Sequence, residues 1–424
     1  MIRFLIKGLF RDKSRSRLPI IVVSVGVMLT VFVHAYITGF MGDTIEMNAR
    51  FSHGHVKVMT KAYADNASQL PNDLALIGVD DLLDDLNKQF PEVKWAPRIQ
   101  FGGLIDVPDE NGETRAQGPA MGMGIDILSE DSWEAERLNI RKSMVRGNII
   151  QNPGEAILSE EFSRKLNVNP GEEVTFIGST MNGSMTMYNF KVAGTVSFGT
   201  EAMDRGAVIV DLEDIRAALD MYNAAGELLG FFDNGFYKDD KAARLAHAFN
   251  ADNKENNDEY APVMKTLSQQ GSMAQYVALA DVWGLYITVV FVFAMALVLW
   301  NAGLLGGLRR YGEFGVRLAM GEEKNHVYRT LIYESVFVGI LGTLIGTIIG
   351  LFFAGLIQKY GIDISGMMEG ASMMFPSTIR TRITPVDYYI GFVPGLLSTV
   401  IGSMLAGIGI FKRKTSQLFK ELEA

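Results

Sequence analysis

The 424-residue sequence contains no cysteine, which excludes a disulfide scaffold and any metal site built on thiolates. It has no Gly-x-x-x-x-Gly-Lys-Ser/Thr motif, so we expect no phosphate-binding loop of its own. The 39 Lys and Arg are outnumbered by 48 Asp and Glu, and the net charge of −9 argues against nucleic-acid binding. We therefore predict that the chain is not an enzyme and that it has no catalytic residue, bound cofactor or metal of its own.

Histidine is also scarce, with five residues, and two placements raise a functional question. His53 and His55 are two positions apart, a spacing that a metal could use on one face of a strand. No third ligand follows nearby, so we interpret them as two surface histidines at the start of a strand. His34 lies inside an apolar stretch, where an ionisable residue is a functional candidate. A neutral, hydrogen-bonded histidine that only packs is the interpretation we favour.

Apolar residues are abundant: they make up 48% of the chain and are concentrated in four stretches. These cover residues 18–40, 282–308, 330–357 and 386–411, and each exceeds the roughly 20 residues needed to cross a bilayer. Gly342, Gly346 and Gly350 recur at every fourth position, which lets membrane helices approach closely. The first stretch is too long for a signal peptide, and no small-residue cleavage site follows it. We predict four membrane-spanning helices.

The distribution of charge predicts the orientation. Residues 1–17 contain six Lys and Arg against one Asp, and residues 309–329 and 412–424 are also net basic. Residues 43–275 contain 21 Lys and Arg against 37 Asp and Glu. Because basic loops stay in the cytoplasm, we expect both termini and the 309–329 loop inside, and the large acidic domain outside.

The acidic segment has the pattern of a mixed α and β domain. Strands are expected at 55–59, 155–158, 173–177, 189–198 and 206–210, with two short strands in 95–107 broken at Gly102–Gly103. Helices are expected at 80–88, at 160–165 and after Asp211. Residues 262–281 have a helical pattern, which predicts one helix of about 45 residues with the second apolar stretch, about twice the bilayer thickness. This helix and the end of the first should continue outward as stalks.

The segment 309–321 has the most informative pattern. On a helix, the charged residues Arg310, Glu313 and Arg317 share one face. Glu313 precedes Arg317 by four residues, the spacing of a helical ion pair. Phe314 and Leu318 form an apolar stripe on another face. The segment therefore predicts a short amphipathic helix between the second and third spans.

Gly321 is expected to end this helix, since glycine is the preferred residue just after a helix C-terminus. A short amphipathic helix between two spans is suited to docking into a groove of a partner protein. A helix that only lies on lipid headgroups is the alternative, and the mixed charges and the terminal glycine favour docking. The candidate docking residues are Arg309, Arg310, Glu313, Phe314, Gly315, Arg317, Leu318 and Gly321.

This segment resembles a known family, the permease subunits of FtsX/MacB-like ABC transporters. The family's Arg-Glu-Ile-Gly-Ile-Arg-Met-Ala-Val-Gly loop is matched at Glu313, Gly315, Arg317, Ala319 and Gly321. Further similarity covers residues 7–17, 124–126, 147–150 and 155–175. The resemblance implies a membrane α-helical fold with four transmembrane helices and one mixed α/β periplasmic domain of MacB-like type.

The resemblance also implies partners and a mechanism. A separate cytoplasmic ABC ATPase dimer would bind the 309–321 helix, then called a coupling helix, and would hold ATP and Mg²⁺. A second permease copy or a related permease would complete the assembly. ATP-driven closure would pass along the stalks to the periplasmic domains, a mechanism called mechanotransmission. The substrate, a lipoprotein, lipid or peptide, would be handled outside the inner membrane or in its outer leaflet.

The predicted organisation follows from these points. It comprises a cytoplasmic basic N-terminal helix (1–17), TM1 (18–41), a periplasmic α/β domain with stalk helices (42–276), TM2 (277–308), the cytoplasmic coupling helix (309–327), TM3 (328–357), a periplasmic loop (358–385), TM4 (386–411) and a cytoplasmic tail (412–424).

Within the family we favour a lipoprotein-releasing permease, because no ATPase domain is fused and the 358–385 loop is rich in methionine, which suits apolar surfaces. Packing of these methionines on the protein's own core explains them equally well. The alternatives are an efflux or export permease for peptides, antibiotics or toxins, and a membrane regulator of a periplasmic partner. The methionines are Met367, Met368, Met373 and Met374.

Overall fold

The computed structural model describes residues 13–199, 201–232, 237–252, 258–271, 273–363 and 378–412. Most of the predicted N-terminal helix, the methionine-rich part of the 358–385 loop and the tail from residue 413 lie outside these residues. The chain divides into two compact units. The helical unit comprises residues 1–43, 279–362 and 379–424, and the sheet unit comprises residues 44–278 and 363–378.

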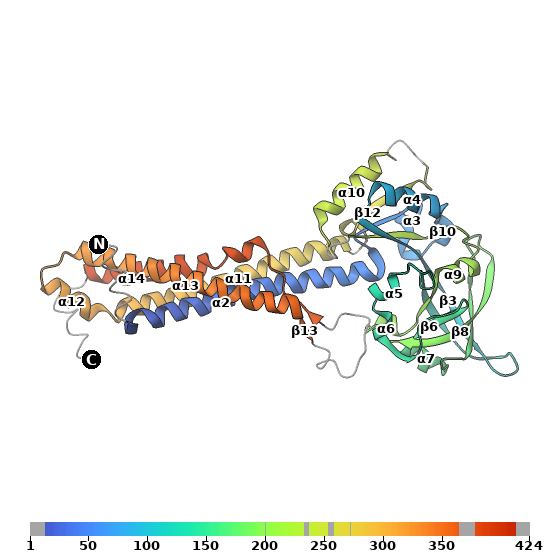
Figure 1. Ribbon diagram of the computed structural model, residues 1–424, viewed down its shortest axis with the longest axis horizontal. Coiled ribbons are helices and arrows are strands. Elements are labelled where there is room, and N and C mark those ends of the chain that lie inside the picture. The colour runs from blue at the N-terminus through green and yellow to red at the C-terminus, as the bar shows by residue number, and fades with distance from the viewer. Residues whose placement is uncertain are drawn as a thin grey trace. The chain divides into compact units, whose positions relative to one another are not determined.

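The helical unit contains the apolar stretches (Figure 1). Among the described residues, four helical segments are long and apolar enough to cross a membrane: Arg17–His53, Met273–Ala319, Lys324–Tyr360 and Pro385–Lys412. The elements within them are α2 (Lys13–Asn48), the π-helical η1 (Ala49–His53), α11 (Met273–Leu308), α12 (Tyr311–Ala319), α13 (Lys324–Tyr360), η6 (Pro385–Tyr388), the π-helical η7 (Val393–Ser398) and α14 (Thr399–Lys412).

The helix α11, which contains the second apolar stretch, is shorter than predicted. α11 begins at Met273, and its 36 residues correspond to about 54 Å, still longer than the roughly 30 Å of hydrocarbon in a bilayer. The prediction of helix from residue 262 is wrong, because Pro262–Thr266 forms strand β12. This strand pairs antiparallel with all five residues of β1 (Val56–Thr60). Pairing with a distant strand thus overrides the local helical pattern.

Small residues bring α13 into close contact with α2. The ridge of Gly342, Gly346 and Gly350 faces α2 along its length. A Cβ atom added at Gly342 would lie 2.6 Å from Val23, and one added at Gly346 would lie 2.5 Å from the carbonyl oxygen of Ser24. The two helices approach this closely because the ridge carries no side chains.

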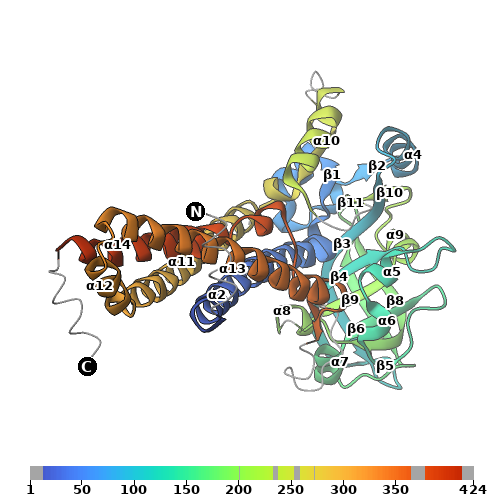
Figure 2. The ribbon, with the colours of Figure 1, turned by 60° about the vertical axis from the view of Figure 1, so that its left-hand side comes forward.

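The sheet unit is built on a ten-stranded sheet (Figure 2). The strand order is β12-β1-β11-β3-β4-β9-β6-β8-β5, and β7 pairs with both β3 and β8, so that β3, β4, β9, β6, β8 and β7 close into a ring. The pairs β4–β9 and β6–β8 are parallel. The remaining bounds are β3 (Val93–Pro108), β4 (Thr114–Ile125), β5 (Met144–Gly147), β6 (Glu155–Ser159), β7 (Glu173–Ser179), β8 (Met185–Val196), β9 (Ala207–Asp211) and β11 (Glu227–Phe232).

The prediction of two short strands in 95–107 is wrong, because β3 is one strand of 16 residues. Gly102 and Gly103 stay in register with β4, opposite Met121 and Ala120. A Cβ atom added at Gly103 would lie 2.5 Å from the ring of Phe176. Because Gly103 has no side chain, the ring of Phe176 packs against it in the core, and the strand continues through the glycine.

The core of the sheet unit is apolar and rich in aromatic rings. Phe101, Phe162, Phe176 and Phe190 are almost fully buried within it.

The helix α9 (Leu212–Ala218) starts directly after Asp211, whose carboxylate accepts the N–H of Glu213 at 3.1 Å. Smaller elements are α3 (Lys61–Asn66), η2 (Ala67–Gln69), η3 (Asn72–Leu74), β2 (Leu76–Ile77), α4 (Val79–Gln89), α5 (Glu134–Arg137), α6 (Ile140–Ser143), α7 (Glu160–Leu166), α8 (Glu201–Asp204), α9 (Leu212–Ala218), β10 (Ala224–Ala225), α10 (Asp239–Asp252), η4 (Leu267–Gln269), β13 (Ile362–Asp363) and β14 (Thr378–Ile379).

Candidate functional site

α12, the helix to which the sequence draws attention, connects α11 to α13. It ends in a Schellman motif: the N–H of Gly321 donates to the carbonyl of Leu318, and the N–H of Glu322 to that of Arg317, both at 3.1 Å. Gly321 has a φ of 94°, a left-handed conformation that favours glycine. The motif fixes the turn between α12 and α13.

One face of α12 is buried against residues of the helical unit. Tyr311 and Phe314 are 4% and 1% exposed, and they cluster with Val327, Leu331 and Ile410. The Tyr311 hydroxyl donates to a backbone carbonyl of α14 at 2.7 Å. Phe314, predicted as a docking residue, therefore holds the helix in place.

The opposite face of α12 is exposed and partly apolar. Val316 is 38% exposed and Met320, just after the helix, is 76% exposed. Of the predicted docking residues, Arg309 is exposed, Leu318 is partly buried and Gly315 is buried. Sequence reasoning missed Val316 and Met320, because periodicity identifies apolar stripes but not the stripe that a neighbouring helix covers.

Ion pairs tie α12 to its surroundings. Arg310 pairs with Glu313 at 3.3 Å and also with Glu334 of α13. The sequence predicted Glu313 as the partner of Arg317, whereas the structure shows a bidentate pair from Arg317 to Glu322 at 2.6 and 2.5 Å. The hydrogen bonds from Arg317 hold the pKa of Glu322 below its usual value, so the pair is ionised at neutral pH.

His34 has a partner that the sequence does not reveal. Its Nδ1 lies 2.7 Å from Oδ1 of Asp387, a fully buried residue 353 positions later. The other carboxylate oxygen of Asp387 accepts the N–H and the hydroxyl of Thr384 at 2.6 and 2.9 Å. His34 is therefore hydrogen-bonded to a buried carboxylate within the helical unit.

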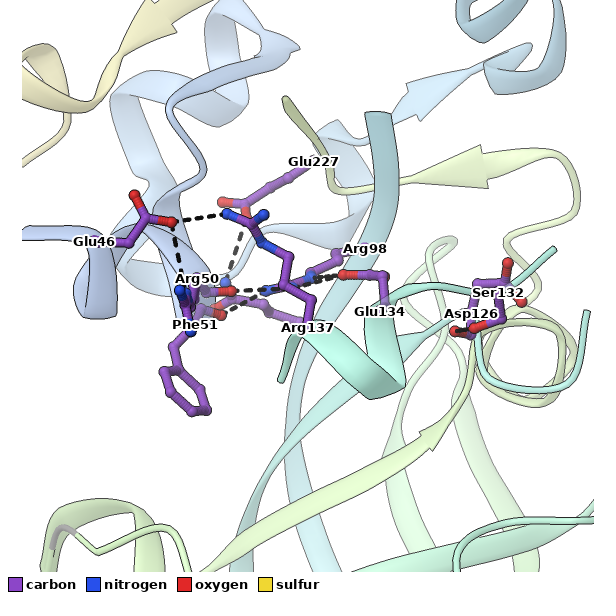
Figure 3. Close-up of polar contacts among 10 residues, drawn as sticks. Glu46, Arg50, Phe51, Arg98, Asp126, Ser132, Glu134, Arg137 and Glu227 are labelled. Carbon is purple, nitrogen blue, oxygen red and sulfur yellow. Dashed lines mark hydrogen bonds and ion pairs between the residues drawn. The ribbon is translucent and has the colours of Figure 1, made fainter. Parts of the chain in front are cut away.

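A buried charge cluster lies at the C-terminal end of α2 (Figure 3). Arg98 of β3 is fully buried and donates to Oε1 of Glu134 from Nε and Nη2, at 2.8 and 2.6 Å. It also donates to the carbonyls of Phe51 at 2.6 Å and Arg50 at 3.1 Å. Burial raises the pKa of Glu134, and Arg98 opposes the shift. The cluster fastens η1 to the sheet.

His55 belongs to the same cluster and is fully buried, so the prediction of a surface position is wrong for this histidine, because η1 and the sheet cover it. Its Nδ1 accepts the N–H of Phe232 at 2.9 Å, and its Nε2 lies 2.7 Å from Oε2 of Glu46. Because Nδ1 accepts, the ring proton is on Nε2 and the imidazole is neutral. The described residues contain no group of three side chains placed to hold a metal ion.

Residues 285–415 match the family model described as FtsX-like permease C-terminal. The chain carries an FtsX-like permease domain. The match includes α12, α13, α14 and most of α11, so the family predicted from the sequence is confirmed over these residues. FtsX-like permeases are transmembrane components of ABC transporters and are not themselves the ATPase.

Among solved structures, the chain is similar to the periplasmic region of MacB from Actinobacillus actinomycetemcomitans. The match has 12% sequence identity and a TM-score of 0.34, and it covers 52% of this chain and 91% of that chain. No curated protein matches the sequence.

Proposed function

We propose that this chain is the permease subunit of an ATP-driven transporter of the inner membrane, that it works by mechanotransmission and that it releases lipoproteins. In this arrangement both termini and α12 lie in the cytoplasm and the sheet unit lies in the periplasm, as the basic and acidic segments predict. A cytoplasmic ABC ATPase dimer, which holds ATP and Mg²⁺, binds α12. A second permease, identical or related, completes the complex.

The way in which α12 is held supports this proposal. Tyr311 and Phe314 anchor one face to the helical unit, whereas Val316 and Met320 remain exposed at the other. The ion pair from Arg310 to α13 adds a polar link between two consecutive helices. A helix that is fixed on one side and exposes apolar side chains on the other is suited to dock into a groove of a partner protein. A displacement of α12 would then be passed to α13.

Replacing Met320 with glutamate is expected to weaken ATPase binding about tenfold or more, because a charge would be buried without a partner in an apolar contact. Met320 is 76% exposed, so the permease should remain folded. Met185→Glu is the matched control, since Met185 of the sheet unit is 72% exposed, and this variant should bind normally. Binding and ATP hydrolysis are measured with the purified ATPase and the permease in nanodiscs. Wild-type affinity of Met320→Glu would refute docking through this surface.

Lipoprotein release rests on the methionine-rich 358–385 loop and on the family resemblance, and depletion of the permease tests it. We expect lipoproteins to accumulate in the inner membrane, and the purified complex to retain acylated protein. Normal lipoprotein sorting with altered drug sensitivity would instead identify an efflux permease. A phenotype that persists without ATPase activity would identify a regulator of a periplasmic partner.

A further inference from the structure

An open pocket of about 330 Å³ lies in the sheet unit, at the charge cluster that ends α2. It is lined by Arg50, Trp133, Glu136 and Arg137. Arg50 belongs to η1, and the other three residues belong to α5 or directly precede it. The sequence analysis predicted no functional role for any of these four residues.

Two guanidinium groups at this pocket share one carboxylate. Nη2 of Arg137 donates to Oε1 of Glu46 at 3.0 Å, and Nε of Arg50 lies 3.5 Å from the same oxygen without making a hydrogen bond (Figure 3). The Nε atoms of both arginines are buried and have no hydrogen-bond partner among the described residues. Glu46 therefore does not satisfy all the hydrogen-bond donors of either guanidinium group. Because buried donors in proteins are usually hydrogen-bonded, these two Nε atoms call for a further acceptor.

The charge balance of the cluster favours an anion as that acceptor. The guanidinium groups of Arg50, Arg98 and Arg137 face two buried carboxylates, those of Glu46 and Glu134. Burial, opposed by Glu46, lowers the pKa of Arg137 to about 10, which leaves this side chain charged at neutral pH. The buried part of the cluster thus has three guanidinium groups and two carboxylates, and the third carboxylate, that of Glu136, lies at the exposed rim of the pocket. Guanidinium groups bind carboxylate and phosphate oxygens through charge-assisted hydrogen bonds.

Aromatic rings hold the Arg137 guanidinium in place. It lies 3.7 Å from the centre of the Phe231 ring and 5.8 Å from that of Trp133, which meets Phe231 edge to face. A guanidinium fixed in this way loses little conformational entropy when it binds a ligand. Trp133 supplies an apolar wall, whereas the exposed carboxylate of Glu136 at the rim disfavours highly charged anions.

We propose that this pocket binds a small oxyanion, a carboxylate or a phosphate group, between the guanidinium groups of Arg50 and Arg137, with Trp133 against its apolar part. The side chains of Arg50 and Arg137 are 37% and 16% exposed, so the ligand reaches both from the pocket. Because both arginines also contact Glu46 of α2, occupancy of the pocket alters the contacts of the last turns of that helix. The site involves neither α12 nor an ATPase, so its test is independent of the transport function.

Calorimetric titration of the full-length chain in phosphatidylcholine nanodiscs with inorganic phosphate, and separately with benzoate, tests this site. At least one probe should bind saturably with a dissociation constant of about 1 mM or tighter. Arg50→Gln and Arg137→Gln should each weaken binding about tenfold or more, because each removes a charged donor. Glu136→Gln should tighten binding about threefold, because it removes a like charge from the rim. A gain of affinity cannot come from misfolding.

Arg115→Gln is the matched control, since Arg115 makes an exposed ion pair with Glu172 at 2.9 Å outside the pocket, and it should bind as the wild type does. Nanodiscs that contain phosphatidylglycerol distinguish the source of the oxyanion. Weaker phosphate binding in them identifies a lipid headgroup as the competing ligand, and unchanged binding identifies a soluble anion. Absence of saturable binding of both probes, or equal affinities in the wild type and both arginine variants, would overturn the proposal.

Discussion

Replacing Arg98 with alanine is expected to lower the free energy of unfolding of the sheet unit by about 3–5 kcal/mol. Arg98 is fully buried, and its guanidinium donates to Glu134 and to two carbonyls of η1, those of Arg50 and Phe51. Without it, Glu134 would be a buried carboxylate that has lost its ion-pair partner, and burial already raises the pKa of that carboxyl. The two carbonyls would lose a charged donor as well.

Hydrogen exchange of the slowest amides in β3 and β11 measures this loss, because amides in core strands exchange only through global opening. Arg115→Ala is the control: its pair with Glu172 is 40% and 38% exposed and should contribute about 0–1 kcal/mol. The double variant Arg98→Met/Glu134→Leu should recover much of the stability, because it leaves no unpaired charge. A loss below about 1 kcal/mol in Arg98→Ala would mean that the cluster does not fasten η1 to the sheet.

Gly346→Ala is expected to destabilise the helical unit by about 2–3 kcal/mol. The added Cβ would lie 2.5 Å from the carbonyl oxygen of Ser24 and 2.8 Å from Cβ of Val27, both on α2. A clash with backbone is not relieved by a rotamer change, so α2 and α13 must move apart along a contact that depends on close approach. Denaturation in detergent micelles, followed by the loss of helical circular dichroism, reports this destabilisation.

Gly355→Ala is the matched control on the same helix. Among the residues that the structure describes, its Cβ would meet only Ile383, at 3.9 Å, an ordinary van der Waals distance. Alanine also has a higher helix propensity than glycine, so this variant should be neutral or slightly stabilised. Equal stabilities of Gly346→Ala and Gly355→Ala would show that the ridge of α13 is not a tight contact.

The elements that could be predicted from the sequence depend on local signals. The helical segments long enough to span a membrane follow from runs of apolar residues, and the end of α12 follows from Gly321. α7 and α9 were expected close to their observed positions, because Ser159 and Asp211 cap them within a few residues of chain. The family was likewise recognisable from local patterns, those of residues 313–321 and 155–175.

The errors occurred where residues far apart in the chain pair with each other. Residues 262–266 have a helical pattern but complete the edge of the sheet next to β1. Gly102 and Gly103 are typical of a strand break, yet β4 holds them in register, and the space left at Gly103 accommodates Phe176. In both places the neighbouring strand, not the local sequence, decides the conformation.

Hydropathy, charge and capping act over a few residues, so the four apolar helices, the acidic α/β segment and the short helix between the second and third apolar stretches all follow from local sequence. The tertiary structure decided that Phe314 is buried while Val316 and Met320 are exposed, and that Arg50 and Arg137 meet at one pocket. Burial and the pairing of charges depend on which distant segments fold against each other, and no local pattern contains that information.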